Sequence, residues 1–151
     1  MLEYRVFTAT RPGLTPGVPP GHESLMWVAN SATLISGERD AVLVDTFLTI
    51  EHGEQLADEV AATGKNLTSI YITHGHGDHF FGINALKRRF PNAKPVSTAA
   101  VVDRMATQLE PAMMDGVFRR GFPGQIPDDP GMAERLDGET LELEGIGRAH
   151  V

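Results

Sequence analysis

The sequence contains no cysteine among its 151 residues. Disulfide bonds, thiolate zinc sites and cysteine nucleophiles are therefore excluded within this chain. The chain also lacks an uninterrupted apolar run of about 18 residues, the length that a membrane-spanning helix needs. Its first five residues carry charges where a signal peptide has its apolar segment. We therefore expect a cytoplasmic protein with no membrane partner.

Positive charge is scarce in this sequence. Lys and Arg total 13 and Asp and Glu total 20, so the formal net charge is −7. A surface this negative repels nucleic-acid phosphates and anionic lipid headgroups, so we expect neither as a partner. The length suits one domain, which we expect to span residues 1–151, and an apolar fraction of 41% is enough for a core.

The apolar patterns alternate between those of strands and those of helices. Short β-prone or alternating runs predict strands, and apolar residues three or four positions apart predict helices. The predicted strands are 4–9, 25–28, 31–35, 41–45, 67–73, 95–97 and 140–145, and the predicted helices are 50–63, 80–90 and 98–109. We expect 25–28 to pair with 31–35. The proline- and glycine-rich stretches 11–21 and 121–131 are expected to be loops.

One short segment carries metal-binding chemistry. Four potential ligands fall within six residues, between a predicted strand and a predicted helix: His74, His76, Asp78 and His79. The first two are two residues apart, so both imidazoles project to one side of an extended backbone. Gly75 and Gly77 let the backbone turn tightly around a common point. Imidazoles with one carboxylate suit Zn²⁺, and iron or manganese is also compatible. Hydrogen-bonded core histidines are the alternative, but they explain one isolated histidine better than this cluster.

At this segment the chain resembles the metallo-β-lactamase superfamily, whose HxHxDH signature is matched in every specified position by residues 74–79. The stretch 42–45, Val-Leu-Val-Asp, is similar to the family's earlier motif, an aspartate at a strand end. The resemblance implies an α+β fold, an αβ/βα sandwich with two metal positions at one edge of its sheets. It implies that His74 and His76 hold the first metal. Asp78 and His79 would hold the second, and Asp45 would lie behind the ligands and orient the histidine loop.

The resemblance also implies a reaction. The protein would be a zinc-dependent hydrolase with one or two metal ions. A metal-bound hydroxide would attack an ester, lactone, thioester or amide of a small-molecule substrate, and Asp78 would also steer the proton of the nucleophile. Two alternatives stay open: an iron-dependent oxidoreductase of the same superfamily, and a non-catalytic metal-binding fragment.

The family's first metal site needs a third histidine well past the signature. His150 stands at about the right separation, but the four residues 148–151 do not resemble the family's Gly-His-Thr-like segment. We therefore expect residues 1–151 to be the N-terminal half of a longer protein, with a second copy or a completing segment as its partner. Hydrolysis by this chain alone is expected to be near background unless His150 supplies the third ligand.

Overall fold

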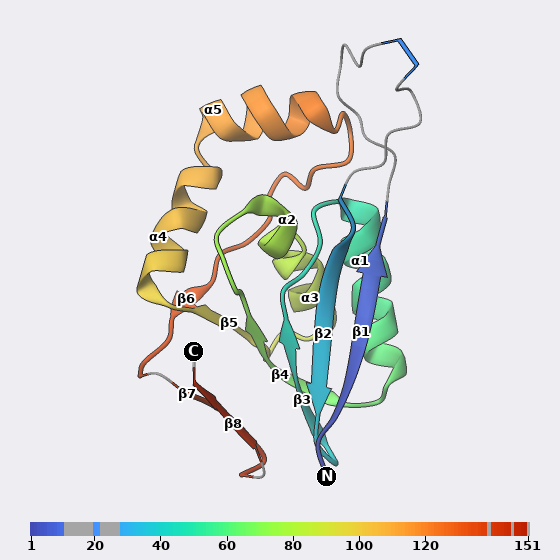
Figure 1. Ribbon diagram of the computed structural model, residues 1–151, viewed down its shortest axis with the longest axis vertical. Helices are drawn as coiled ribbons and strands as arrows, with labels where there is room; N and C mark the ends of the chain where they lie inside the picture. Colours follow the sequence, from blue (N-terminus) through green and yellow to red (C-terminus); the bar gives the residue numbers. More distant parts are fainter. Residues whose placement is uncertain (11–19, 22–27, 139, 146, 151) are drawn as a thin grey trace.

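A mixed six-stranded sheet forms the centre of the computed structural model, which describes residues 1–10, 20–21, 28–138, 140–145 and the backbone of 147–150 (Figure 1). Its strands, in spatial order, are β1 (Glu3–Ala9), β2 (Asn30–Ser36), β3 (Asp40–Val44), β4 (Asn66–Tyr71), β5 (Lys94–Ser97) and β6 (Glu134–Arg135). The pairs β1–β2 and β2–β3 are antiparallel, and the pairs from β3 to β6 are parallel.

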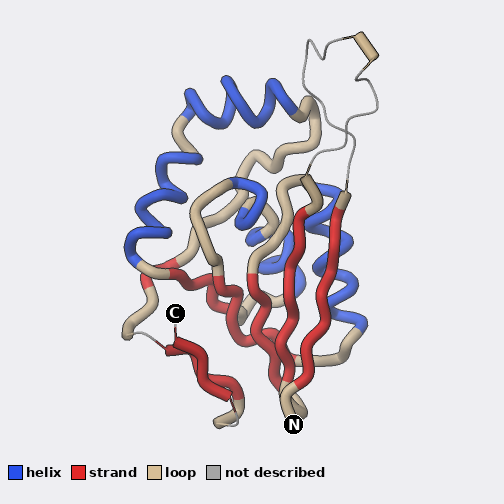
Figure 2. Tube along the Cα trace, in the orientation of Figure 1, coloured by secondary structure: helices blue, strands red, loops and turns tan. Residues whose placement is uncertain are grey.

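Helical segments make the crossovers that parallel strands require, as Figure 2 shows. These segments are α1 (Ile50–Ala62) after β3, α2 (Gly77–Phe80) and α3 (Ile83–Arg89) after β4, and α4 (Ala99–Gln108) after β5. Beyond α4, α5 (Pro111–Met113) continues into the π-helical segment η1 (Met114–Arg119). α1 packs against α3, and both lie behind the sheet in the view of Figure 1.

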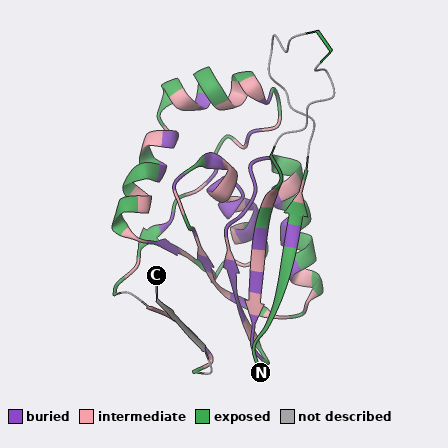
Figure 3. Ribbon diagram, in the orientation of Figure 1, coloured by how far each residue is buried: buried purple, intermediate pink, exposed green. Residues whose placement is uncertain are grey.

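The core lies between the central strands and these helices (Figure 3). Leu43 and Ile70, which are neighbours in the register of β3 and β4, are completely buried. α1 presents Leu56 and Val60 to the same core, because residues four apart share one face of a helix. β1 lies at the edge of the sheet, and most of its residues are exposed. β3 and β4 are therefore central strands, each paired on both edges.

Most of the predicted elements are confirmed to within two residues. The expected pairing of 25–28 with 31–35 is not confirmed, because both edges of β2 are occupied by β1 and β3. Residues 25–27 lie outside the described residues. The predicted helix 80–90 is two helices, α2 and α3. The break has a physical cause, because the Gly82 N–H donates to the Thr46 side chain at 3.1 Å. α5, η1, β6 and β8 were not predicted.

A separate antiparallel hairpin, β7 (Thr140–Leu143) with β8 (Gly147–His150), contacts β3 through β7. Glu144 follows β7 and accepts hydrogen bonds from the backbone N–H groups of residues 38, 39 and 40 at 2.9, 2.6 and 2.5 Å. Lys65 donates to the carbonyls of residues 37 and 38 at 2.9 and 2.8 Å. The turn between β2 and β3 is thus bound by a carboxylate on its N–H side and by an ammonium on its carbonyl side.

The Glu144 carboxylate is therefore expected to hold the hairpin against the sheet. In Glu144→Ala, hydrogen exchange at the amides of Arg39 and Asp40 should accelerate, because they lose their acceptor. Glu142→Ala removes a carboxylate from the same hairpin and is the control. The N–H groups of Asp40 and Arg39 hold the pKa of Glu144 below its ordinary value. The wild-type protection should therefore persist above the ordinary glutamate pKa and disappear as the pH falls through the lowered one. Equal exchange in wild type and Glu144→Ala would contradict this role.

Candidate metal centre

The four predicted ligand residues lie where β4 ends and α2 begins. Residues 73–76, which we call the histidine loop, lead from β4 into α2 and lie below α5 in the view of Figure 1. Asp78 and His79 follow on α2. Asp45, directly after β3, reaches the same edge because β3 and β4 are parallel neighbours whose carboxyl ends lie together. The fold thus brings residues from two strand ends and one short helix to one place.

The three imidazoles of this cluster are in contact. The ring centroids of His74 and His76 are 4.9 Å apart, and those of His74 and His79 are 3.7 Å apart. His79 Nε2 is 3.7 Å from Asp78 Oδ2. The side chains of Asp78 and His79 are each 22% exposed, so solvent reaches the cluster. The structure therefore brings together all four residues that the sequence singled out.

Asp45 adopts a left-handed backbone conformation with φ of 61°, which is uncommon for a residue other than glycine. Its N–H donates to the Tyr71 carbonyl at 2.8 Å, which joins the ends of β3 and β4. Its Oδ1 accepts from the Thr73 N–H at 2.8 Å, and its Oδ2 accepts from the Thr73 hydroxyl at 2.6 Å. The same Oδ2 lies 2.9 Å from His79 Nδ1. This buried carboxylate therefore holds both the start of the histidine loop and His79.

These contacts assign the tautomers of His79 and His74. Because the carboxylate of Asp45 can only accept, Nδ1 of His79 carries the proton, and Nε2 remains as the electron-pair donor. The Thr73 hydroxyl gives its proton to Asp45, so its oxygen is an acceptor for Nδ1 of His74, 3.2 Å away. His74 thereby also keeps Nε2 as a donor of electrons. In their neutral forms, both rings therefore have the tautomer that a metal requires of a ligand bound through Nε2.

The pKa values of His74 and His79 are shifted in opposite directions. Burial, together with the nearby positive charges of His79 and His76, lowers the pKa of His74 from its ordinary value, which favours the neutral ring. Burial also disfavours the charged form of His79, but the hydrogen bond and negative charge of Asp45 and the charge of Asp78 outweigh it. The pKa of His79 is therefore raised. In the metal-free chain, His79 and Asp45 thus form a charged pair at mildly acidic pH.

Thr46 and Asn30 complete the surroundings of the cluster, and sequence reasoning missed both. The Thr46 N–H and hydroxyl donate to the His79 carbonyl at 2.8 and 3.1 Å, which fixes the backbone of α2. Asn30, at the start of β2, donates through Nδ2 to Asp78 Oδ2 at 2.8 Å. Asn30 lies 48 residues upstream of Asp78, and nothing in the local sequence pattern connects the two.

The donor chemistry of the cluster fits a transition metal. Two ligand bonds of about 2.0–2.2 Å can span the 3.7 Å between His79 Nε2 and Asp78 Oδ2, at an angle wider than tetrahedral. Among the described residues, no three His, Asp or Glu side chains already converge as a ready-made site. The side chain of His150, in β8, lies outside the part of the chain that the structure describes. The four residues therefore supply suitable donor atoms as two pairs, His74 with His76 and Asp78 with His79.

Comparison with known proteins gives the family. The profile of the metallo-β-lactamase superfamily matches residues 25–151, and the chain belongs to this superfamily. It is 30% identical over 114 residues to a hydroxyacylglutathione hydrolase of Synechococcus sp., a match that covers 76% of this chain and 38% of the relative. It is 38% identical over 64 residues to a UPF0173 metal-dependent hydrolase of Brucella anthropi, which covers 42% of this chain and 27% of the relative.

Solved structures agree with the fold. The metallo-β-lactamase SMB-1, in complex with mercaptoacetic acid, superposes with a TM-score of 0.54 at 30% identity, covering 77% of this chain and 44% of that chain. The metallo-β-lactamase DIM-1 superposes with a TM-score of 0.59 at 17% identity, covering 94% and 54%. The expected α+β, metallo-β-lactamase-like fold is confirmed. The chain spans less than half the length of the two curated relatives named above.

Two expectations concern the surroundings of the protein. Within the described residues, no helix combines the length and the apolar character that crossing a membrane requires. The cytoplasmic location, the single domain and the absence of a nucleic-acid partner stay predictions.

The role of Asp45 can be measured through the protonation of His79. In the metal-free Asp45→Asn chain, the negative charge beside His79 is lost while the His79 ring stays buried. The pKa of His79 should therefore fall. A proton–carbon NMR titration of the histidine ring signals measures this change, and Asp40→Asn, at the opposite end of β3, is the matched control. An unchanged titration of His79 in Asp45→Asn would contradict the pairing.

The same shift has a consequence for stability. A raised pKa means that the His79–Asp45 pair stabilises the fold below the unfolded histidine pKa and that this contribution is lost as the pH rises through the raised pKa. Asp45→Asn should therefore reduce the free energy of unfolding more in mildly acidic than in alkaline solution.

Proposed function

We propose that His74, His76, Asp78 and His79 bind one or two zinc ions and that the protein is a hydrolase of an ester, lactone, thioester or amide. The observation that carries this proposal is the pairwise contact among three imidazoles, with the Asp78 carboxylate beside His79 at the same edge of the sheet and Nε2 of two rings left as donors. Membership of the metallo-β-lactamase superfamily supports it. The names of the relatives, a metal-dependent hydrolase and a hydroxyacylglutathione hydrolase, support it further.

The ligands divide into two pairs in this proposal. His74 and His76 would hold the first ion, because their rings are adjacent on one side of the histidine loop. Asp78 and His79 would hold the second, since their donor atoms face each other at 3.7 Å. Water molecules, and ligands from elsewhere in the protein, would complete each coordination shell.

When bound, the metal would supply Lewis acidity that activates a water molecule and stabilises negative charge on the substrate. Asp45 binds Nδ1 of His79 and leaves Nε2 facing Asp78, and Thr46 holds the backbone of His79. Asn30 holds one oxygen of Asp78, which sets the direction of the other. That second oxygen would be available to accept the proton of a water molecule that the metal activates. The protein residues thus orient ligands and manage one proton.

The substrate is proposed to be a small molecule that carries one of these acyl groups, and the reaction is proposed for the cytoplasm. An iron-dependent oxidoreductase uses the same ligand types, so the identity of the metal separates it from the hydrolase. Elemental analysis of the purified protein measures this directly: zinc supports the hydrolase, and iron as the main metal favours the oxidoreductase.

Metal content should depend on the histidine loop. We expect His76→Ala to lower the zinc retained after dialysis several-fold, because a site with so few protein ligands loses most of its affinity with any one of them. His52→Ala is the matched control, since it removes a histidine that lies on α1. Inductively coupled plasma mass spectrometry gives the zinc-to-protein ratio. Equal ratios in wild type and His76→Ala would rule out this site.

Hydrolysis should depend on the same residues. His74 and His76 give the first metal two protein ligands, whereas a catalytic zinc usually has three, so we expect a low rate for residues 1–151. The rate with an acyl thioester or a p-nitrophenyl ester in the presence of zinc should fall to the uncatalysed rate with a chelator and in His74→Ala. His52→Ala should keep the wild-type rate. Turnover that survives both chelation and His74→Ala would show that the reaction does not use this cluster.

A further inference from the structure

The histidine loop is covered by a helical arm, by which we mean α4, α5 and η1, residues 99–119. A β-carbon on Gly77 would lie 2.8 Å from Cζ of Phe81 and 2.9 Å from Cζ of Phe118. A β-carbon on Gly75 would lie 2.7 Å from Cβ of Arg104. Such distances are too short for carbon atoms, so both glycines are positions of close approach. The loop that carries His74 and His76 is thus packed directly against the arm.

Phe118 makes the contact between η1 and the start of α2. Its ring meets the ring of Phe81 edge to face, with centroids 4.7 Å apart and planes at 64°. Phe81 in turn meets Phe80 at 4.9 Å and 87°. Phe80 and Phe81 are almost completely buried, whereas Phe118 is only partly buried. Phe118 therefore closes an aromatic cluster whose other members lie directly after Asp78 and His79.

Buried residues on both sides of Phe118 hold this part of the chain in place. Met114 and Phe122, four residues before and after Phe118, are both buried in the core. The N–H of Phe122 donates to the carbonyl of Phe118 at 2.8 Å. The two buried residues thus anchor the helix on either side of Phe118.

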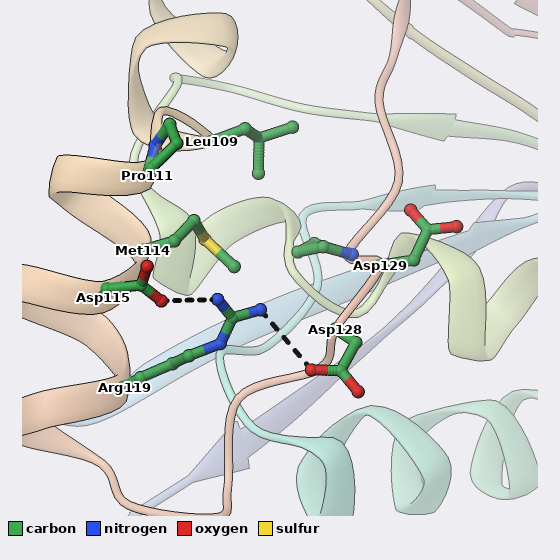
Figure 4. Close-up of a pocket in the computed structure, with 8 residues that line it drawn as sticks. Leu109, Pro111, Met114, Asp115, Arg119, Asp128 and Asp129 are labelled. Carbon is green, nitrogen blue, oxygen red and sulfur yellow. Dashed lines mark hydrogen bonds and ion pairs between the residues drawn. The ribbon is translucent and has the colours of Figure 1, made fainter.

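Ion pairs in the lining of a pocket beside the arm give η1 a second, weaker attachment to the rest of the fold (Figure 4). Arg119 points between Asp115, on the same helix, and Asp128, on the following loop, with N–O distances of 2.7 and 3.4 Å. These side chains are exposed, so the ion pairs contribute little to stability. They nevertheless join η1 to the loop at 128–130, which is itself bonded to Asn84 of α3. The ion pairs and this hydrogen bond therefore connect η1, which carries Phe118, to α3.

We propose that Phe118 is a positioning residue for the candidate metal centre. Its ring packs against Gly77 and Phe81. This contact fixes the start of α2 together with the histidine loop. Through this contact the helical arm determines where His76 and Asp78 lie before a metal binds. The effect of Phe118 on metal binding rests on the proposed function. Its effect on the conformation of the metal-free histidine loop rests on packing alone.

Zinc affinity tests the first consequence. In Phe118→Ala, the dissociation constant for Zn²⁺, measured by competition with a chromophoric chelator, should rise about tenfold or more, the range seen when a residue that orients a ligand is lost. Phe118→Leu keeps an apolar side chain against Gly77 and should stay within about threefold of wild type. Val117→Ala, on the exposed side of the same helix, is the control. The visible spectrum of the Co²⁺-loaded chain should change in Phe118→Ala and not in Val117→Ala.

Amide exchange of the metal-free chain tests the second consequence. The N–H groups of His79 and Phe81 donate to the carbonyls of His76 and Gly77 at 2.9 and 3.0 Å. In Phe118→Ala these two amides should exchange at least about tenfold faster, while Leu43 in β3 keeps its wild-type rate, because the loss is local and not global. If Phe118→Ala does not fold, Phe118→Val removes the ring at a smaller loss of apolar volume and takes its place.

The two measurements separate the two claims. Unchanged zinc affinity, or acceleration at His79 and Phe81 that only matches that at Leu43, would overturn the proposal and leave Phe118 as an ordinary packing residue. If the wild-type chain binds no zinc, the proposed function fails, and amide exchange alone then decides whether Phe118 positions the loop.

Discussion

The buried carboxylate of Asp45 joins three segments that lie far apart along the chain: the end of β3, the start of the histidine loop at Thr73, and His79 on α2. A carboxylate loses its hydration on burial, and it is tolerated only where hydrogen bonds replace that hydration. Here the left-handed backbone of Asp45 turns the side chain toward all three of its donors. The same contacts set the tautomers of His74 and His79, so the chemistry of the site follows from this one constraint.

The candidate site is held between two layers that have different physical tasks. Beneath it, polar contacts from Asp45, Thr46 and Asn30 orient the ligand side chains. Above it, the helical arm packs on Gly75 and Gly77, whose lack of a β-carbon permits the contact. The glycines of the HxHxDH segment therefore serve packing as much as flexibility. The polar contacts on one side and the close packing of the helical arm on the other together hold the histidine loop in one conformation.

Local patterns in the sequence predict what depends on local contacts. The buried strands, α1 and the proximity of His74, His76, Asp78 and His79 were predicted, because apolar periodicity and residue spacing are read over a few residues. The break between α2 and α3 was not, since it comes from Thr46, more than thirty residues away, binding the N–H of Gly82. Asn30, Phe118 and Glu144 were missed for the same reason. Each acts on a segment that only folding brings near, and the glycines and proline around η1 gave no sign of a helix.

If the histidine loop and α2 together bind a metal ion, its protein ligands are imidazole nitrogen and carboxylate oxygen. X-ray absorption spectroscopy of the zinc-loaded chain distinguishes these ligands, because imidazole rings produce outer-shell scattering that water and carboxylate ligands do not. We expect a first shell of nitrogen and oxygen at about 2.0–2.2 Å with scattering from at least two imidazoles, reduced in His76→Ala. A first shell of oxygen alone, without imidazole scattering, would contradict it.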